Sequence, residues 1–141
     1  MYPIRYHSDI VENIPKISNV KNVDSEEIAE LLKSKEVEGK IHTIWTFKTP
    51  YIGAICNCDH TGCLLFHLKN RYKFADIILK GHEIAQIDHE ICIVCGKCIK
   101  ICQFNAITVV DKKTIINNNC YGCGVCRTNC PMEAIQLLPK T

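Results

Sequence analysis

Two stretches of the sequence decide the fold: CIVCGKCIKICQFNAITVV at residues 92–110 and CYGCGVCRTNCPMEAIQLL at residues 120–138. Each contains four cysteines in the spacing C-x2-C-x2-C-x3-C. Such a spacing is too specific to arise twice by chance, so we interpret the eight thiols as ligands of a repeated inorganic group. The eight are Cys92, Cys95, Cys98 and Cys102 in the first run, and Cys120, Cys123, Cys126 and Cys130 in the second.

The spacing is typical of loops that bind [4Fe-4S] clusters. A cubane cluster needs one thiolate at each of four irons. Three cysteines two residues apart can wrap one loop around three irons, and the fourth ligand must come from elsewhere. Where two such runs occur together, the fourth cysteine of each run ligates the other cluster. We therefore expect one cluster at Cys92, Cys95, Cys98 and Cys130, and a second at Cys120, Cys123, Cys126 and Cys102.

Zinc and disulfides are the alternatives to clusters. Zinc can occupy pairs of C-x2-C motifs, but a four-ligand zinc site does not explain a third evenly spaced cysteine. Disulfides would require an oxidising compartment, and the polar N-terminus MYPIRYHSDIVENIP lacks the apolar stretch of an export signal. We therefore expect a reducing cytoplasm, and an anaerobic one because such clusters are sensitive to oxygen.

The two runs continue into a longer repeat in which a cysteine loop is followed by a short helix and a strand. We expect strands at residues 84–91, 106–111, 114–119 and 134–138, with a turn at residues 111–113 between the middle two. The predicted fold class is α+β, with a pseudo-symmetric βαββαβ arrangement at residues 84–141. Residues 84–140 resemble the two-[4Fe-4S] ferredoxins, a resemblance that implies electron transfer.

One position departs from the ferredoxin pattern. Pro131 follows the last cysteine of the second run, but Gln103 stands at the equivalent position of the first. Proline at this position would shape the loop and remove an N–H donor. We expect Gln103 to alter the potential or the solvent access of the second cluster.

Residues 1–83 predict a small α+β domain of their own. Asp24 or Ser25 can cap a helix at residues 26–34, and the alternating residues 41–47 read as a strand. Pro50 and Gly53 predict a loop, and a second helix is expected after Gly62. The predicted inward residues are Ile28, Leu31 and Leu32 on the first helix, and Leu64, Leu65, Leu68 and Tyr72 on the second.

Three cysteines remain outside the repeat: Cys56, Cys58 and Cys63. They predict either buried thiols or a third metal site holding zinc, iron or a cluster. His60, Asp59 and His42 are the candidates for a fourth ligand. The stretch HTIWTFKTPYIGAICNCD at residues 42–59 also resembles the CNC-box domain of uncharacterised iron–sulfur proteins from anaerobes. That resemblance implies a redox role but no substrate.

The composition bounds the function further. The net charge is +2 with scattered histidines, so no basic stripe predicts nucleic-acid binding. No stretch approaches the ~20 apolar residues of a membrane span. No nucleotide fingerprint or nucleophile–base pair predicts an enzyme. We expect low-potential one-electron transfer, by a subunit or dedicated partner of a larger anaerobic oxidoreductase. The alternative is an iron–sulfur enzyme with an open metal site at the N-terminal cysteines.

Overall fold

The computed structural model describes residues 23–48, 51–72 and 78–140. In these ranges the first helix is α2 (Ser25–Val37), followed by the hairpin β1 (Ile41–Lys48) and β2 (Tyr51–Cys58), and by α3 (Leu64–Arg71). The cysteine repeat folds as β3 (Glu83–Ile87), α4 (Lys97–Ile101), β4 (Ile107–Val110), β5 (Lys113–Ile116), α5 (Val125–Thr128) and β6 (Ile135–Pro139). No helix in the described ranges could cross a membrane.

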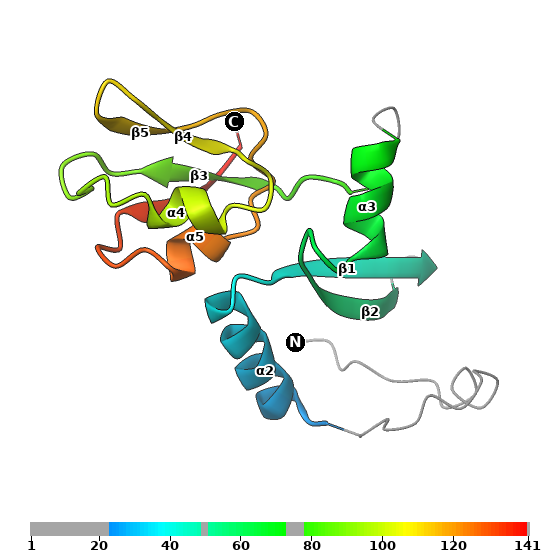
Figure 1. The fold of residues 1–141 in the computed structure, drawn as a ribbon. Coiled ribbons are helices and arrows are strands. Elements are labelled where there is room, and N and C mark those ends of the chain that lie inside the picture. Colours follow the sequence, from blue (N-terminus) through cyan, green and yellow to red (C-terminus); the bar gives the residue numbers. More distant parts are fainter. Residues whose placement is uncertain (1–22, 49–50, 73–77, 141) are drawn as a thin grey trace.

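The repeat has the predicted element types in the predicted order (Figure 1). β3 pairs antiparallel with β6, and β4 pairs antiparallel with β5. The tight turn between β4 and β5 is confirmed, because Asp111 and Lys112 both adopt the positive φ of a two-residue hairpin turn. A two-fold relation between the halves stays a prediction.

β3 and β5 end earlier than expected because a side chain ends each one. β3 stops before Asp88, whose carboxylate accepts the backbone N–H of Glu90 at 2.9 Å. β5 stops before Asn117, whose side-chain oxygen accepts the N–H of Asn119 at 2.8 Å. Such side-chain turns compete with the strand ladder. Each turn delivers the chain to the first cysteine of its run, since Cys92 N–H donates to the Asp88 carbonyl at 3.1 Å and Cys120 N–H donates to that of Asn117 at 3.1 Å.

The predicted N-terminal helix and strand are confirmed. Asp24 caps α2, because its carboxylate accepts the N–H groups of Glu26 at 2.9 Å and Glu27 at 2.8 Å. β1 includes the whole predicted strand. The inward face of α2 differs from expectation, since Ile28 and Leu32 are half-buried but Leu31 is exposed.

The predicted loop around Gly53 is wrong, and Pro50 lies outside the described residues. Residues 51–58 form β2, which pairs with β1 through partners such as Thr43 and Cys56, and Ile41 and Cys58. Cys56 and Cys58 therefore lie on a strand rather than in a polar loop. Their i, i+2 spacing places both on one face of that strand, while Ile55 on the other face is exposed.

The inward face of α3 also differs from the predicted stripe. Phe66 is buried, whereas Leu64 and Tyr72 are exposed and Leu65 and Leu68 are half-buried. Phe66 forms the centre of an apolar cluster that joins the two parts of the chain, and we call it the junction cluster. Its buried members are Ile41, Cys58, Phe66, Ile78 and Val125.

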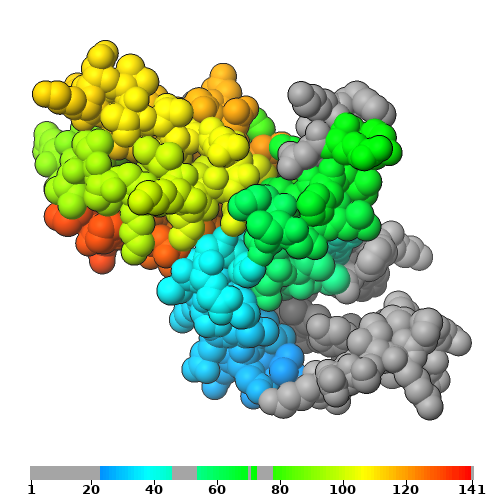
Figure 2. Space-filling model, in the orientation of Figure 1, coloured from blue at the N-terminus to red at the C-terminus, as the bar shows by residue number. Residues whose placement is uncertain are grey.

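The N-terminal elements lie directly against the repeat, as the cyan and green surface beside the yellow surface shows (Figure 2). At one contact, the Asn129 side chain at the end of α5 donates to the Glu36 carbonyl of α2 at 3.0 Å. Thr128 Oγ1 donates to the Glu36 carboxylate at 3.1 Å. The end of α2 is thus held at the position just before Cys130.

We expect the contact between β3 and the second cysteine loop to depend on Gly122. Its φ is +71°, and a Cβ there would lie 2.2 Å from the Glu83 carbonyl oxygen. Gly122→Ala should destabilise the protein by at least about 2 kcal/mol, because a strained φ and a backbone overlap add. Thermal unfolding followed by circular dichroism should begin at a lower temperature than in the parent protein.

Gly62→Ala is the matched control, since the nearest atom to its Cβ would be Asp59 Oδ1 at an ordinary 3.7 Å. A Gly122→Ala protein that resists heat as well as the control would contradict the close approach.

Candidate functional site

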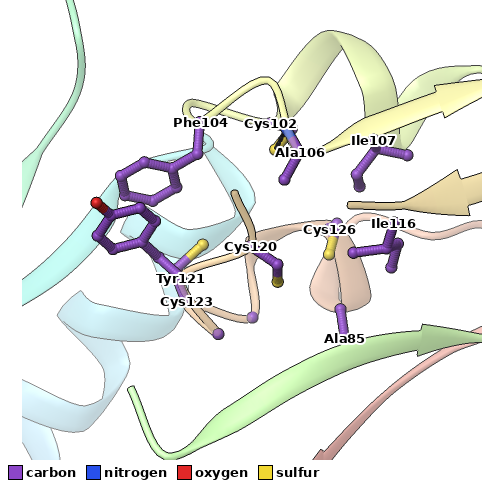
Figure 3. Close-up of a pocket in the computed structure, with 12 residues that line it drawn as sticks. Ala85, Cys102, Phe104, Ala106, Ile107, Ile116, Cys120, Tyr121, Cys123 and Cys126 are labelled. Carbon is purple, nitrogen blue, oxygen red and sulfur yellow. Dashed lines mark hydrogen bonds between the residues drawn. The ribbon is translucent and has the colours of Figure 1, made fainter. Parts of the chain in front are cut away.

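The eight repeat cysteines line two separate cavities. Cavity one measures about 360 Å³ and cavity two about 350 Å³, with the open space at their mouths included. Each cavity takes three cysteines from one run and the fourth from the other run. Cavity one is lined by Cys92, Cys95, Cys98 and Cys130; cavity two is lined by Cys102, Cys120, Cys123 and Cys126 (Figure 3).

Small residues at equivalent places give these cavities their room. Ala106 lines cavity two and Ala134 lines cavity one, and each is 1 % exposed. Each carbonyl accepts a backbone N–H from the turn before a cysteine run at 2.8 Å, Ala106 from Asn117 and Ala134 from Asp88. A larger side chain at either alanine would enter the space between the thiols.

Both fourth cysteines are aimed by a tight turn that follows them. Asn105 N–H donates to the Cys102 carbonyl at 3.4 Å, and Glu133 N–H donates to that of Cys130 at 3.2 Å. Both donors have a positive φ, 52° at Asn105 and 51° at Glu133. The turn reverses the chain after each short helix and sends it into the next strand. It therefore leaves the fourth cysteine facing the cavity of the other run.

The three-cysteine loops turn into their helices at glycines. Gly96 precedes α4 with a φ of 73°, and Gly124 precedes α5 with a φ of 83°. The left-handed region is easily reached by glycine, so the loop can pass close to the cavity at these points. The two glycines therefore hold equivalent positions in the two loops.

The thiols are chemically suited to bind metal rather than to stay ionised alone. Burial raises the pKa of Cys126 to about 12, and repulsion from Cys123 and Cys102 adds to it. Burial also raises the pKa of Cys123 and of Cys98. Thiolates gathered in an apolar cavity need a cationic centre to offset their charge, and binding that centre releases the protons.

Apart from the cysteines, the residues that line the two cavities are mostly apolar, which fits an iron–sulfur group. Thr114 contributes a hydroxyl to cavity one, 3.7 Å from Cys92 Sγ. No described group of three or more Cys, His, Asp or Glu side chains is close enough to hold a single metal ion. Thiols dispersed around a cavity suit a multi-iron group, whose four irons separate the ligands. The residues present therefore fit a [4Fe-4S] cluster in each cavity.

The two cavities differ in their exposure. Cys95 beside cavity one is exposed, as are Ile93 and Met132 in the same lining. Cavity two lies beside aromatic rings, where Phe104 stacks on Tyr121 with 4.0 Å between centroids (Figure 3). Phe66 meets Phe104 with 5.4 Å between centroids. Phe104 and Tyr121 thus shield cavity two, and Phe66 of α3 adds a third layer. Shielding of this kind changes the potential of a cluster.

A lysine cation completes this cover. Lys69 of α3 places its Nζ 4.3 Å from the Tyr121 ring centroid and 5.4 Å from that of Phe104. Cation–π contacts of this geometry are attractive. Gly81 N–H also donates to the Tyr121 carbonyl at 2.9 Å, so the segment that enters β3 holds the loop from the other side.

Gln103 connects the first cysteine run to the N-terminal elements. Its Nε2 donates to the Gly39 carbonyl at 3.1 Å, and its Oε1 accepts the His60 backbone N–H at 3.1 Å. The His60 ring Nδ1 contacts the same oxygen. Proline has no side-chain amide and could make none of these contacts. The departure from the ferredoxin pattern therefore supplies a tie between the two parts of the chain.

The three extra cysteines lie together but do not form a described metal group. Cys58 Sγ is 3.3 Å from Cys63 Sγ, and all three pack in or against the junction cluster. The candidate fourth ligands have other partners. Asp59 forms an ion pair with Lys40, which lowers the pKa of its carboxyl; His60 contacts Gln103; and His42 Nδ1 meets Asn57 at 2.7 Å. The third metal site stays a prediction.

Comparison with known proteins agrees with this geometry over the repeat. Residues 85–137 match the family of 4Fe-4S dicluster domains. The pyruvate synthase subunit PorD of Methanothermobacter marburgensis is 38% identical over 52 residues, which cover 36% of this chain and 60% of that protein. The chain thus spans less than two thirds of the length of this relative, and the match covers about the length of the repeat.

Exchange of the fourth cysteine between the cavities can be tested with one serine at a time. Cys130→Ser should disturb the signal of the group held by Cys92, Cys95 and Cys98, because Cys130 lines their cavity. Cys102→Ser should disturb the other signal. Electron paramagnetic resonance of the reduced variants distinguishes them. If each variant instead lost the signal of the group held by the three other cysteines of its own run, the exchange would be contradicted.

The role of Gln103 can be tested separately from folding of the repeat. Gln103→Ala removes its contacts with Gly39 and His60, so backbone hydrogen exchange should rise about tenfold at these two segments, the equivalent of about 1.4 kcal/mol. Gln86→Ala, at an exposed position of β3, is the control. Equal exchange in both variants would exclude the tie.

Proposed function

We propose that the chain transfers single electrons through two [4Fe-4S] clusters, as a subunit or dedicated partner of a larger oxidoreductase. Cavity one would hold its cluster with Cys92, Cys95, Cys98 and Cys130, and cavity two with Cys102, Cys120, Cys123 and Cys126. The observation that carries the proposal is the grouping of each fourth cysteine with the first three of the other run. The dicluster match over residues 85–137 and the likeness to PorD support it.

Each cluster, when bound, can accept and release one electron. The protein supplies four thiolates to each cluster, limits the access of water and holds the two groups in fixed positions. Ala85, Ile107 and Ile135 form an apolar core that packs against cysteines of both runs. The electron can therefore pass between two sites without crossing solvent. The βαββαβ relation between the halves belongs to the same proposal.

The difference in exposure between the two cavities suggests where other redox proteins contact the chain. Cavity one reaches the surface at Cys95, whereas α3 and the aromatic rings cover cavity two. Beside the cover, His60, Lys69 and Lys100 line an open cleft with Cys102 and Phe104. An acidic redox partner fits the two lysines of this cleft. In the proposal, exposed cavity one and this cleft are the two places of electron entry and exit.

The N-terminal elements are proposed to form the docking part of such a subunit. They contact the repeat next to both fourth cysteines, through Gln103 and Asn129. A partner bound to them would therefore be fixed relative to both cavities. The alternative of an enzyme with an open metal site at Cys56, Cys58 and Cys63 has no described group of three ligands to support it.

Anaerobic reconstitution followed by protein-film voltammetry tests the proposed function. We expect two one-electron waves below 0 mV, toward the negative end of the range of about −700 to +450 mV for such clusters. Metal analysis should give about eight irons and eight sulfides per chain, since each cubane holds four of each. One wave with half that iron, or zinc in place of iron, would overturn the assignment of two clusters. Two waves above 0 mV would overturn the low-potential role.

A further inference from the structure

The contact between Cys58 and Cys63 is the feature that electron transfer through the repeat does not use. The two sulfurs are 3.3 Å apart and come from different elements, the end of β2 and the residue that precedes α3. A disulfide bond joins sulfurs at about 2.05 Å. The remaining gap can be closed by small rotations of two side chains.

A rigid turn holds the two thiols in this position. Asp59 Oδ1 accepts three hydrogen bonds, from Thr61 N–H at 2.9 Å, Thr61 Oγ1 at 2.6 Å and Gly62 N–H at 2.8 Å. Cys63 N–H donates to the Asp59 carbonyl at 3.3 Å. The pairing of Cys58 with Ile41 of β1 fixes the other end of the turn. Little conformational entropy remains to be lost when the sulfurs join.

Only two of the three extra thiols are paired in this way. Cys56 lies two residues back on the same face of β2, opposite Thr43 of β1. Among the described residues, the Cys56 sulfur makes no contact like the one that joins Cys58 and Cys63. A metal site would need three or four ligands converging on one point. Two thiols in contact, with the third nearby on the same strand face but outside that contact, are instead the arrangement of a dithiol.

We propose that Cys58 and Cys63 form a reversible dithiol–disulfide couple that exchanges with disulfide compounds. In the first step the Cys63 sulfur attacks a disulfide R–S–S–R, forming a mixed disulfide and releasing R–SH. In the second step the Cys58 sulfur attacks Cys63 and releases the second R–SH. The two cysteine protons end on the two released thiols. The protein pair loses two electrons, and the compound gains them.

The order of the two steps follows from exposure. Cys58 is buried at 7 % exposure, whereas Cys63 is half-buried at the start of α3. An external disulfide can therefore reach Cys63 but not Cys58. Cys58 acts only on the mixed disulfide, because it already lies against the attacked sulfur. The couple packs in and against the junction cluster, which also contacts Cys123 of cavity two.

Thiol mapping on the anaerobically purified, iron-loaded chain tests the couple. The protein is equilibrated with oxidised and reduced glutathione at graded ratios, quenched with acid and alkylated, and its peptides are weighed. The peptide with Cys58 and Cys63 should lose the mass of two hydrogens as the oxidised fraction rises, and a dithiol reductant should restore it. Cys56 should be alkylated at every ratio.

Single serine variants test the order of attack. Cys58→Ser should trap glutathione on Cys63, whereas Cys63→Ser should leave Cys58 unmodified. Cys56→Ser is the matched control from the same strand face, and it should form the cross-link as the parent does.

Three results would overturn the couple. The first is alkylation of both cysteines at every glutathione ratio while the iron content stays constant. The second is a cross-link to Cys56. The third is about one equivalent of metal beyond the cluster iron that is lost in Cys58→Ser, because a third metal site would then hold these thiols. Voltammetry of the repeat is independent of all three, so failure of the couple leaves the electron-transfer proposal to be decided by its own test.

Discussion

The passage of each fourth cysteine into the cavity of the other run is the constraint on which the rest of the structure depends. Cys102 and Cys130 each follow a short helix, and each faces the cavity formed by the opposite loop. Neither cavity can be completed by its own half of the repeat. A metal group bound at either one therefore cross-links both halves, as the pairing of β3 with β6 also does. Separation of the halves would break both cavities at once, which makes the repeat one cooperative unit.

The same constraint explains the composition of the core. Apart from the cysteines, the described buried residues of the repeat are few, and three of them are the alanines Ala85, Ala106 and Ala134. Short strands of four or five residues bury too little apolar area to offset the entropy of folding alone. The cysteines that pack against this core extend it when they hold a metal group, so metal binding and folding are coupled. A larger core would fill the cavities that the function needs.

The local features were predictable from the sequence, and the contacts between distant segments were not. The Asp24 cap, the hairpin turn at Asp111 and the glycines before α4 and α5 depend on a few neighbouring residues, which a pattern can specify. The burial of Phe66 was not predicted, because it depends on contact with Phe104, 38 positions away in the chain, and does not follow the period of an amphipathic helix. The alternation of Cys56 and Cys58 did carry a strand signal, but the nearby Pro50 and Gly53 suggested a loop. Gln103 was noticed only as a missing proline, since its partners Gly39 and His60 come from another part of the chain.

The N-terminal elements make the two cavities unequal. Gln103 directly follows Cys102 and Asn129 directly precedes Cys130, so both ties to these elements are made beside a fourth cysteine. The aromatic layer of Phe66, Phe104 and Tyr121 covers only cavity two, and Cys95 leaves cavity one near solvent. Water stabilises the more highly charged state of a buried group, so exposure and cover shift potentials in different directions. Two cavities with the same four-thiol ligand set can therefore differ in potential through their surroundings alone. Under the proposed function, the N-terminal elements would then influence the direction of electron flow as well as the place where a partner binds.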